Sequence, residues 1–167
     1  MSRIKACSVV TTLVALVLVV LPATAASRNG LEKNKAVARR VFDEIFNQGR
    51  FEVADEIYAR NFVNHVIHRE AGLKEDQDAA RGWKLAFPDL KIAVLKEIAE
   101  GDLVTVLYSI TGTNTGEGNG LPATGKKIEG RGITIWRIEN GKITEEWSEF
   151  DQLGMMKELG LLPDSAK

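Results

Sequence analysis

Cysteine is almost absent from this chain: Cys7 is the only one, and it lies in an apolar segment close to the N-terminus. The chain beyond that segment contains no thiol, which excludes a disulfide, a cysteine nucleophile and a cysteine-ligated metal there. Histidine is nearly as scarce, since only His65 and His68 occur. Their spacing suggests a metal pair, but no third ligand follows nearby, so we predict no metal site.

An excess of basic residues is also lacking. The 22 Lys and Arg residues are balanced by 23 Asp and Glu residues, which gives a formal net charge of −1. No basic stripe runs along any segment, so the sequence does not favour a nucleic-acid partner. The chain also has no internal repeat and no low-complexity segment.

A long hydrophobic run occurs only once. Residues 9–21 are almost continuously apolar, follow Arg3 and Lys5, and precede Pro22 and a small-x-small sequence at residues 23–25. This pattern is typical of a secretory signal peptide, and the run is shorter than the roughly 20 apolar residues that span a bilayer. We therefore predict a signal peptide at residues 1–26, an exported (periplasmic or secreted) protein, and no stable membrane anchor after cleavage.

The rest of the chain is predicted to consist of a linker at residues 27–31, a domain at residues 32–162 and a tail at residues 163–167. Its length of roughly 140 residues is that of one domain.

The first half of this domain has helical periodicity. Apolar residues recur every three or four positions before Gly49, again at residues 51–59, and a third time at residues 72–87. Pro88 ends the third helix, because the residue before a proline is disfavoured in the helical region. A short extended segment is expected at residues 61–66.

The second half has the period of strands. We predict a strand from residue 90 up to a turn at residues 101–102, a second at residues 103–113, a loop at residues 114–126 that closes over the site as a mobile flap, and a hairpin around Asn140-Gly141. A short helix at residues 155–159 follows. Segregated helices and strands indicate an α+β fold, with three N-terminal helices on a curved four-stranded antiparallel sheet. A conical cavity is expected between the sheet and the first and third helices.

Side chains on the last strand alternate between two faces. Glu146, Ser148 and Phe150 share one face, while the neighbouring acids and Trp147 share the other. The face that points into the fold decides which acids are available for chemistry.

Seven segments, in this order and at these spacings, resemble one family. They are NKAVARRVFDEIFNQG (34–49), ARNFVNH (59–65), AFPDL (86–90), AEGDLVTV (99–106), GTNTGEGNGLPATGKK (112–127), RGITIWRIENGKITEEW (131–147) and DQLGMMKELG (151–160). Together they resemble the SnoaL-like polyketide cyclases, also called ester cyclases, of the NTF2-like superfamily. The resemblance covers residues 32–162 and implies the cone-shaped NTF2-like fold.

The resemblance implies an intramolecular aldol ring closure on a polyketide ester, without metal or cofactor. It places the family's catalytic aspartate at Ser148 and a family histidine near Thr134, so both positions depart from the pattern. The family's asparagine is matched by Asn64. The resemblance also places the Glu146–Ser148–Phe150 face toward the cavity.

Three residues other than Ser148 are candidate proton carriers. Glu146 would have a raised pKa if it were buried against aromatic residues, but it would be ordinary if it were solvated at the cavity mouth. Asp151 either turns inward or caps the last helix. His65 has a suitable pKa range, although a surface histidine is an equal alternative.

Aromatic residues make up the predicted wall of the cavity, with Asn64 and Thr134 as polar members. The aromatic candidates are Phe42, Phe46, Trp83, Tyr108, Trp136 and Phe150. They are either a plain core or the wall of a site for a flat, apolar or polyketide-like ligand.

Three functions are compatible with these residues. The first is an exported SnoaL-like ester cyclase that works by general acid/base catalysis. The second is a non-catalytic binding protein for small hydrophobic ligands, in which Ser148 marks the lost acid. The third is another cofactor-free reaction, such as isomerisation or hydrolysis. Export weighs against the first, because polyketides are tailored where they are made. A homodimer through the outer sheet face, where Trp147 would lie, is also predicted.

Overall fold

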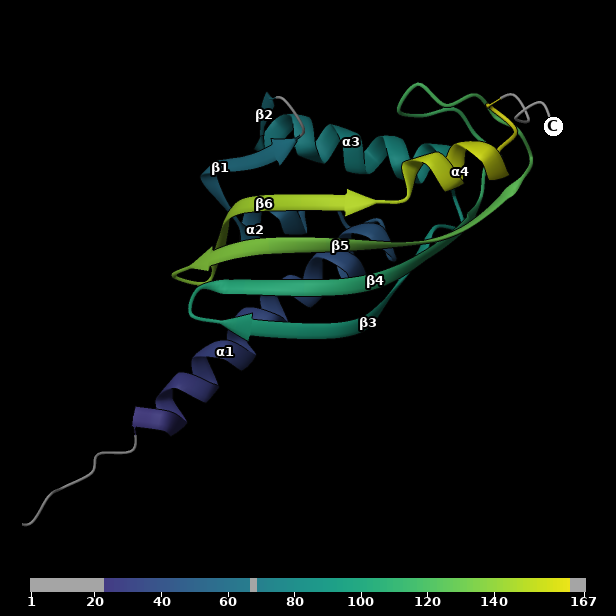
Figure 1. The fold of residues 1–167 in the computed structure, drawn as a ribbon. Coiled ribbons are helices and arrows are strands. Elements are labelled where there is room, and N and C mark those ends of the chain that lie inside the picture. The colour runs from purple at the N-terminus through teal and green to yellow at the C-terminus, as the bar shows by residue number, and fades with distance from the viewer. Residues whose placement is uncertain (1–22, 67–68, 163–167) are drawn as a thin grey trace, which may run out of the picture.

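The computed structural model describes residues 23–66 and 69–162 (Figure 1). Most of the predicted signal peptide, the predicted tail at residues 163–167 and His68 lie outside the described residues. The secondary-structure elements, in chain order, are α1 (Ala23–Arg40), η1 (Val41–Phe46), α2 (Val53–Ile57), β1 (Tyr58–Val66), β2 (Arg69–Gly72), α3 (Leu73–Ala86), β3 (Lys91–Glu100), β4 (Leu103–Thr113), β5 (Lys127–Glu139), β6 (Lys142–Phe150) and α4 (Gln152–Glu158). The α+β class is confirmed.

The sheet is larger than predicted. It has six strands in the order β2-β1-β6-β5-β4-β3, and β1 pairs with β6 in parallel while every other pair is antiparallel. The expected four-stranded antiparallel sheet is therefore wrong. The sheet also includes β1, where a short extended segment was predicted at residues 61–66, and β2, and both lie between α2 and α3. The parallel pair starts at Tyr58 and Ile143, which are too far apart in sequence for a local signal to reveal their contact.

The β5–β6 hairpin is as predicted. Asn140 and Gly141 both have positive φ, at 52° and 75°, and the strands on either side pair in register, with Glu139 opposite Lys142. Two central residues with positive φ form the type I′ turn that matches the twist of adjacent strands. This hairpin fixes which residues of β6 face the interior.

The predicted linker at residues 27–31 is helical and belongs to α1. Gly30 alone does not end the helix, since a single glycine costs only about 1 kcal/mol relative to alanine. No helix among the described residues is long and apolar enough to cross a membrane.

The end of the first helix is wider than an α-helix. In η1 the N–H of Asn47 donates to the carbonyl of Phe42, five residues back, at 2.8 Å. Wide helical turns of this kind are frequent at functional sites. This turn places Val41, Phe42 and Ile45 among the buried core residues.

The helices cover one face of the sheet (Figure 1). The core between the two layers is built mainly from η1 and α2 on the helical side and from the inward residues of β4 and β5. Phe42 packs on Trp136 with ring centroids 5.2 Å apart, and Trp136 is 1% exposed. The sheet therefore has one covered face and one open face.

The loop at residues 114–126 lies along α3. Asn114 is fully buried and donates to the carbonyl of Ala86 at 3.1 Å, while Asn119 donates to the carbonyl of Ala79 at 2.9 Å. A Cβ on Gly118 would overlap the carbonyl oxygen of Gly82, so the two backbones are in close contact. The loop packs along this helix, and none of its residues lines the cavity described below, so the predicted position of the loop as a flap over the cavity is wrong.

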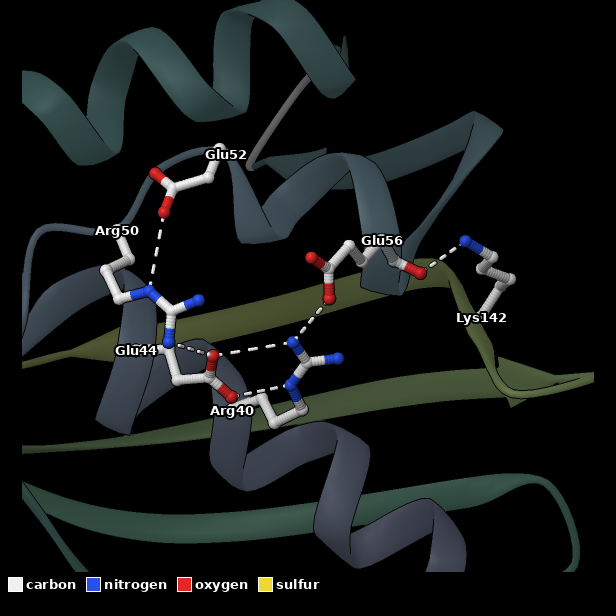
Figure 2. Close-up of polar contacts among 6 residues, drawn as sticks. All are labelled: Arg40, Glu44, Arg50, Glu52, Glu56 and Lys142. Carbon is white, nitrogen blue, oxygen red and sulfur yellow. Dashed lines mark hydrogen bonds and ion pairs between the residues drawn. The ribbon is translucent and has the colours of Figure 1, made fainter.

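A network of charged residues joins the helices to the sheet at one end (Figure 2). Its members are Arg40, Glu44, Arg50, Glu52, Glu56 and Lys142. Arg40 is central, since it contacts Glu44 and Glu56 at 2.6 Å each. Lys142, at the start of β6, donates to the backbone carbonyl of Glu56. The network therefore connects α1, η1 and α2 to the strand that carries the candidate site.

Candidate functional site

A cavity of about 430 Å³ lies between the covered face of the sheet and the helices η1 and α3. Its lining is mostly aromatic and aliphatic. All six predicted aromatic residues line it: Phe42, Phe46, Trp83, Tyr108, Trp136 and Phe150. The cavity is thus where the sequence placed it, between the sheet and the ends of the first and third predicted helices.

Glu146, Ser148 and Phe150 line this cavity together, as the alternation along β6 predicts. Phe150 meets Trp83 of α3 edge to face, with ring centroids 5.6 Å apart, so sheet and helix are in contact at this end. Glu146 lies four residues earlier in β6, directly opposite Trp136 of β5.

Glu146 is held by two hydrogen-bond donors. The indole Nε1–H of Trp136 donates to its Oε2 at 2.8 Å, and the hydroxyl of Ser148 donates to its Oε1 at 2.7 Å. The Ser148 hydroxyl also shares a hydrogen bond of 2.8 Å with Thr134. Burial, and then the charge of Asp76, raise the pKa of Glu146 from 4.5 to about 7, against the opposite effect of the two donors. Glu146 can therefore exchange a proton near neutral pH.

Asp76 is a second carboxyl group in the cavity wall, and the sequence analysis missed it. It comes from α3, and its Oδ1 accepts a hydrogen bond of 2.8 Å from Asn64. Burial raises the pKa of Asp76, while the bond from Asn64 opposes the rise. The signal was present in the sequence, because Asp76, Ala80 and Trp83 follow the i, i+4, i+7 spacing of one helix face.

Asn64 lies next to Glu146 in the sheet and is hydrogen-bonded to Asp76. It is the register partner of Glu146 in the parallel pair β1–β6, so both side chains point to the same face of the sheet. Its amide reaches Asp76 on the helix above. The two acids therefore face the cavity from opposite layers, on either side of Asn64.

Two tyrosines complete the polar part of the cavity. Tyr58 and Tyr108 both line it. Burial, and then the negative charge of nearby acids, raise the pKa of the Tyr58 hydroxyl. Burial likewise raises the pKa of Tyr108, and the charge of Glu146 acts in the same direction. Both hydroxyls stay protonated at neutral pH and can donate hydrogen bonds.

Comparison with known proteins gives the family. The sequence model described as SnoaL-like polyketide cyclase matches residues 36–159. The chain belongs to this family. Among its curated relatives is the aklanonic acid methyl ester cyclase DauD of Streptomyces sp. strain C5, which is 31% identical over 124 residues, or 70% of this chain and 76% of DauD.

Solved structures of related proteins have the same fold as this chain. AclR of Streptomyces galilaeus, a candidate hydroxylase, has a TM-score of 0.73 at 25% identity and covers 82% of this chain and 87% of AclR. A candidate polyketide cyclase from Bacillus cereus has a TM-score of 0.68 at 27% identity, with 78% of this chain and 83% of that chain covered. The NTF2-like fold is therefore shown.

In this SnoaL-like protein His65 is the surface histidine, the second of the two alternatives predicted for it. His65 points to the open face of the sheet, where its Nε2 lies 2.8 Å from Oε2 of Glu145. Its ring stacks on Trp147 with centroids 4.6 Å apart and planes 8° apart. The expectation of His65 as a proton carrier in the cavity is wrong, because Asn64 points inward and adjacent residues of a strand point to opposite faces.

Asp151 has the second of its two predicted roles, that of a helix cap. Its carboxylate accepts a hydrogen bond of 2.8 Å from the N–H of Gly154 and thereby caps the N-terminus of α4. It does not line the cavity. Of the predicted proton carriers, the structure brings together Glu146 and Ser148, with Thr134 beside them. No group of three or more potential metal ligands occurs among the described residues.

Proposed function

We propose that this SnoaL-like protein closes a ring in a polyketide-type ester by an intramolecular aldol reaction, with Glu146 as a proton carrier and no cofactor. The observation that carries this proposal is the 2.7 Å hydrogen bond from Ser148 to Glu146. The family resemblance places the catalytic aspartate at Ser148. A serine hydroxyl is neither an acid nor a base on its own near neutral pH, but a carboxyl group behind it can give or take a proton through it.

The chemistry needs two proton transfers. One proton leaves the carbon next to a carbonyl, the resulting enolate carbon attacks a ketone of the same molecule, and the new alkoxide takes up a proton. A carboxyl group with a pKa of about 7 is suited to such transfers, because general acid/base catalysis is most efficient when the pKa is close to the working pH. Ser148 would relay protons between Glu146 and the cavity.

The two tyrosines would stabilise the developing negative charge. Tyr58 and Tyr108 are neutral at pH 7 and line the same cavity. Hydroxyl donors that reach an enolate oxygen in a largely apolar cavity act more strongly than in solution. The aromatic wall would hold a flat, apolar ligand in place.

The test uses aklanonic acid methyl ester, the compound named for DauD. The wild-type protein is expected to cyclise it, and E146Q is expected to be slower by about 100- to 10,000-fold, the usual effect of removing a general acid or base. E145Q is the matched control, since Glu145 is the adjacent residue on the open face of the sheet. S148A is expected to be slower and S148D at least as active as the wild type. Equal rates for E146Q and E145Q would contradict the role of Glu146.

The second candidate is binding without catalysis. It is favoured by Ser148 itself, because the family's acid is missing there. Displacement of a hydrophobic dye by the ester, with no cyclisation by the wild type or by S148D, would support this candidate over the first.

We also propose that the protein is exported after loss of residues 1–26. The predicted signal peptide supports this. Mass spectrometry of the protein recovered outside the cytoplasm of the producing cells would give its N-terminus. A full-length chain that stays in the cytoplasm would contradict export.

A further inference from the structure

Asp76 has no part in the proposed function so far, although it lies in the same cavity as Glu146. Asp76 comes from α3 and Glu146 from β6, so they face the cavity from the helical layer and from the sheet. Asn64 lies beside Glu146 in the sheet and donates to Asp76 at 2.8 Å. The strand pairing and this hydrogen bond together keep the two carboxyl groups near each other.

No positively charged side chain of the described residues lines the cavity beside Asp76 and Glu146. Of the described residues that line the cavity, none is lysine, arginine or histidine, and the titratable ones are Tyr58, Asp76, Tyr108, Glu146 and Glu149. Two neighbouring carboxyl groups in such a site oppose each other's ionisation, so one of them keeps a proton when the other is charged.

We infer that Asp76 and Glu146 form one acid/base pair, in which Asp76 takes the proton from the α-carbon and Glu146 supplies a proton to the ketone oxygen. The inference rests on the proposed cyclisation, and it adds a second catalytic residue on a different layer of the fold.

Burial and the charge of Asp76 decide which acid has which role. Together they raise the pKa of Glu146 to about 7, although Trp136 and Ser148 both donate to it, so Glu146 keeps a proton in part of the molecules at neutral pH and is the acid. Asp76 is then the base, and the hydrogen bond from Asn64 favours its ionised form. Groups whose environments separate their pKa values in this way divide acid and base roles.

The step balances without any further reagent. The α-carbon loses its proton to Asp76, a carbon–carbon bond forms as the ketone π bond becomes the oxygen's electron pair, and that oxygen takes the proton of Glu146. The site then holds a protonated Asp76 and an ionised Glu146. Transfer of one proton from Asp76 to Glu146, directly or through water, restores the starting state.

The first experiment measures the pair without substrate. The carboxyl groups of Asp and Glu are labelled with ¹³C in the full chain and titrated by NMR, with E146Q identifying the Glu146 signal. In D76N the pKa of Glu146 is expected to fall by about one unit or more, because a negative neighbour is lost. D78N is the matched control, since Asp78 is an exposed residue of the same helix, paired with Lys74 at 2.6 Å. An unchanged Glu146 titration in folded D76N would overturn the pair.

A reciprocal measurement guards against a misfolded variant. Coupling between two sites is the same seen from either one, so E146Q is expected to lower the pKa of Asp76 by a similar amount. If the pKa of Asp76 were identical in E146Q and the wild type, the pair would be overturned even if D76N did not fold.

The second experiment measures the pH profile of kcat/KM with aklanonic acid methyl ester. A bell-shaped profile is expected for the wild type, with loss of the acid limb in D76N, loss of the alkaline limb in E146Q, and rates about 100-fold lower or more in both. A D76N protein with the wild-type rate and profile overturns the inference but leaves the proposed function intact. Coupled titration without any cyclisation contradicts the proposed function and supports the pair.

Discussion

Gly132 of β5 lies directly opposite Tyr108 of β4, and the tyrosine ring covers the glycine. A Cβ at residue 132 would overlap the Tyr108 hydroxyl, and Tyr108 is only 8% exposed and lines the cavity. We therefore expect G132A to displace the ring, to lower the free energy of unfolding by about 1 to 3 kcal/mol, as overpacking does, and to weaken cyclisation of the ester.

The control for this variant is G130A. Gly130 lies on the same face of β5, where a Cβ would meet only Ile110 at 3.6 Å, an ordinary contact. Urea unfolding of G132A, G130A, Y108A and the double variant G132A/Y108A gives the coupling energy of the pair. If G132A were no less stable than G130A, the proposed close contact would be wrong.

The stability of the protein is expected to depend on Glu146 between pH 4.5 and 7. Its pKa is about 7 in the folded state against an ordinary value of 4.5, so the folded state binds more protons in this range. The free energy of unfolding therefore falls as the pH rises from 4.5 to 7. At about 1.4 kcal/mol for each pH unit between the two pKa values, the loss due to Glu146 is up to about 3 to 4 kcal/mol.

E146Q removes this contribution. Its free energy of unfolding should change less between pH 4.5 and pH 8 than that of the wild type, measured by denaturant unfolding at several pH values. E145Q, on the open face, should retain the wild-type slope in this range. Parallel curves for E146Q and the wild type would show that Glu146 has an ordinary pKa in the folded state.

Local sequence signals predicted the hairpin and the second long strand. Asn140-Gly141 requires positive φ at both positions, and the β4 range was predicted without error, because alternation within a strand depends on neighbouring residues only. The pairing of β1 with β6 was not predictable in this way. It joins Tyr58 to Ile143, and such long-range pairing depends on how the whole chain closes rather than on local preference.

The candidate site was likewise predicted only in part, because local signals do not show how distant segments pack together. The alternation along β6 placed Glu146 and Ser148 on one face, and the family resemblance turned that face inward. The side of the sheet on which His65 lies was left open, because no local signal fixes the orientation of β1 relative to β6. Asp76 was not predicted, because it is one of several acidic residues in the third helix and the apolar stripe alone does not distinguish it from the others. A carboxyl group in line with an apolar stripe is costly to bury without a role, and it therefore merits attention as a candidate site residue.

Trp136 is expected to control the acidity of Glu146. Its indole N–H donates to Oε2 at 2.8 Å and so favours the ionised form, which lowers the pKa. In W136F this donor is lost, and we expect the pKa of Glu146 to rise further above its value of about 7. The ¹³C titration measures the change, and W147F on the open face is the control. A lower or unchanged pKa in W136F would contradict the role of the indole.

The charge of the cavity predicts discrimination between an ester and its free acid. Asp76, Glu146 and Glu149 line the cavity, and none of the other described residues in its wall carries a positive charge. A ligand with a free carboxylate would add another negative charge beside them, and like charges a few ångströms apart in a protein repel by about 1 to 4 kcal/mol. We therefore expect the methyl ester to bind at least about tenfold more tightly than the free acid at pH 8, since tenfold corresponds to about 1.4 kcal/mol.

Isothermal titration calorimetry with aklanonic acid methyl ester and with aklanonic acid measures this ratio. The ratio is expected to shrink at pH 5, where Glu146 is protonated, and to shrink at pH 8 in the double variant D76N/E146Q. D78N should keep the wild-type ratio, because Asp78 lies outside the cavity wall. Tighter binding of the free acid than of the ester at pH 8 would mean that a positive charge reaches the ligand, and the acidic cavity would then not determine which compound is bound.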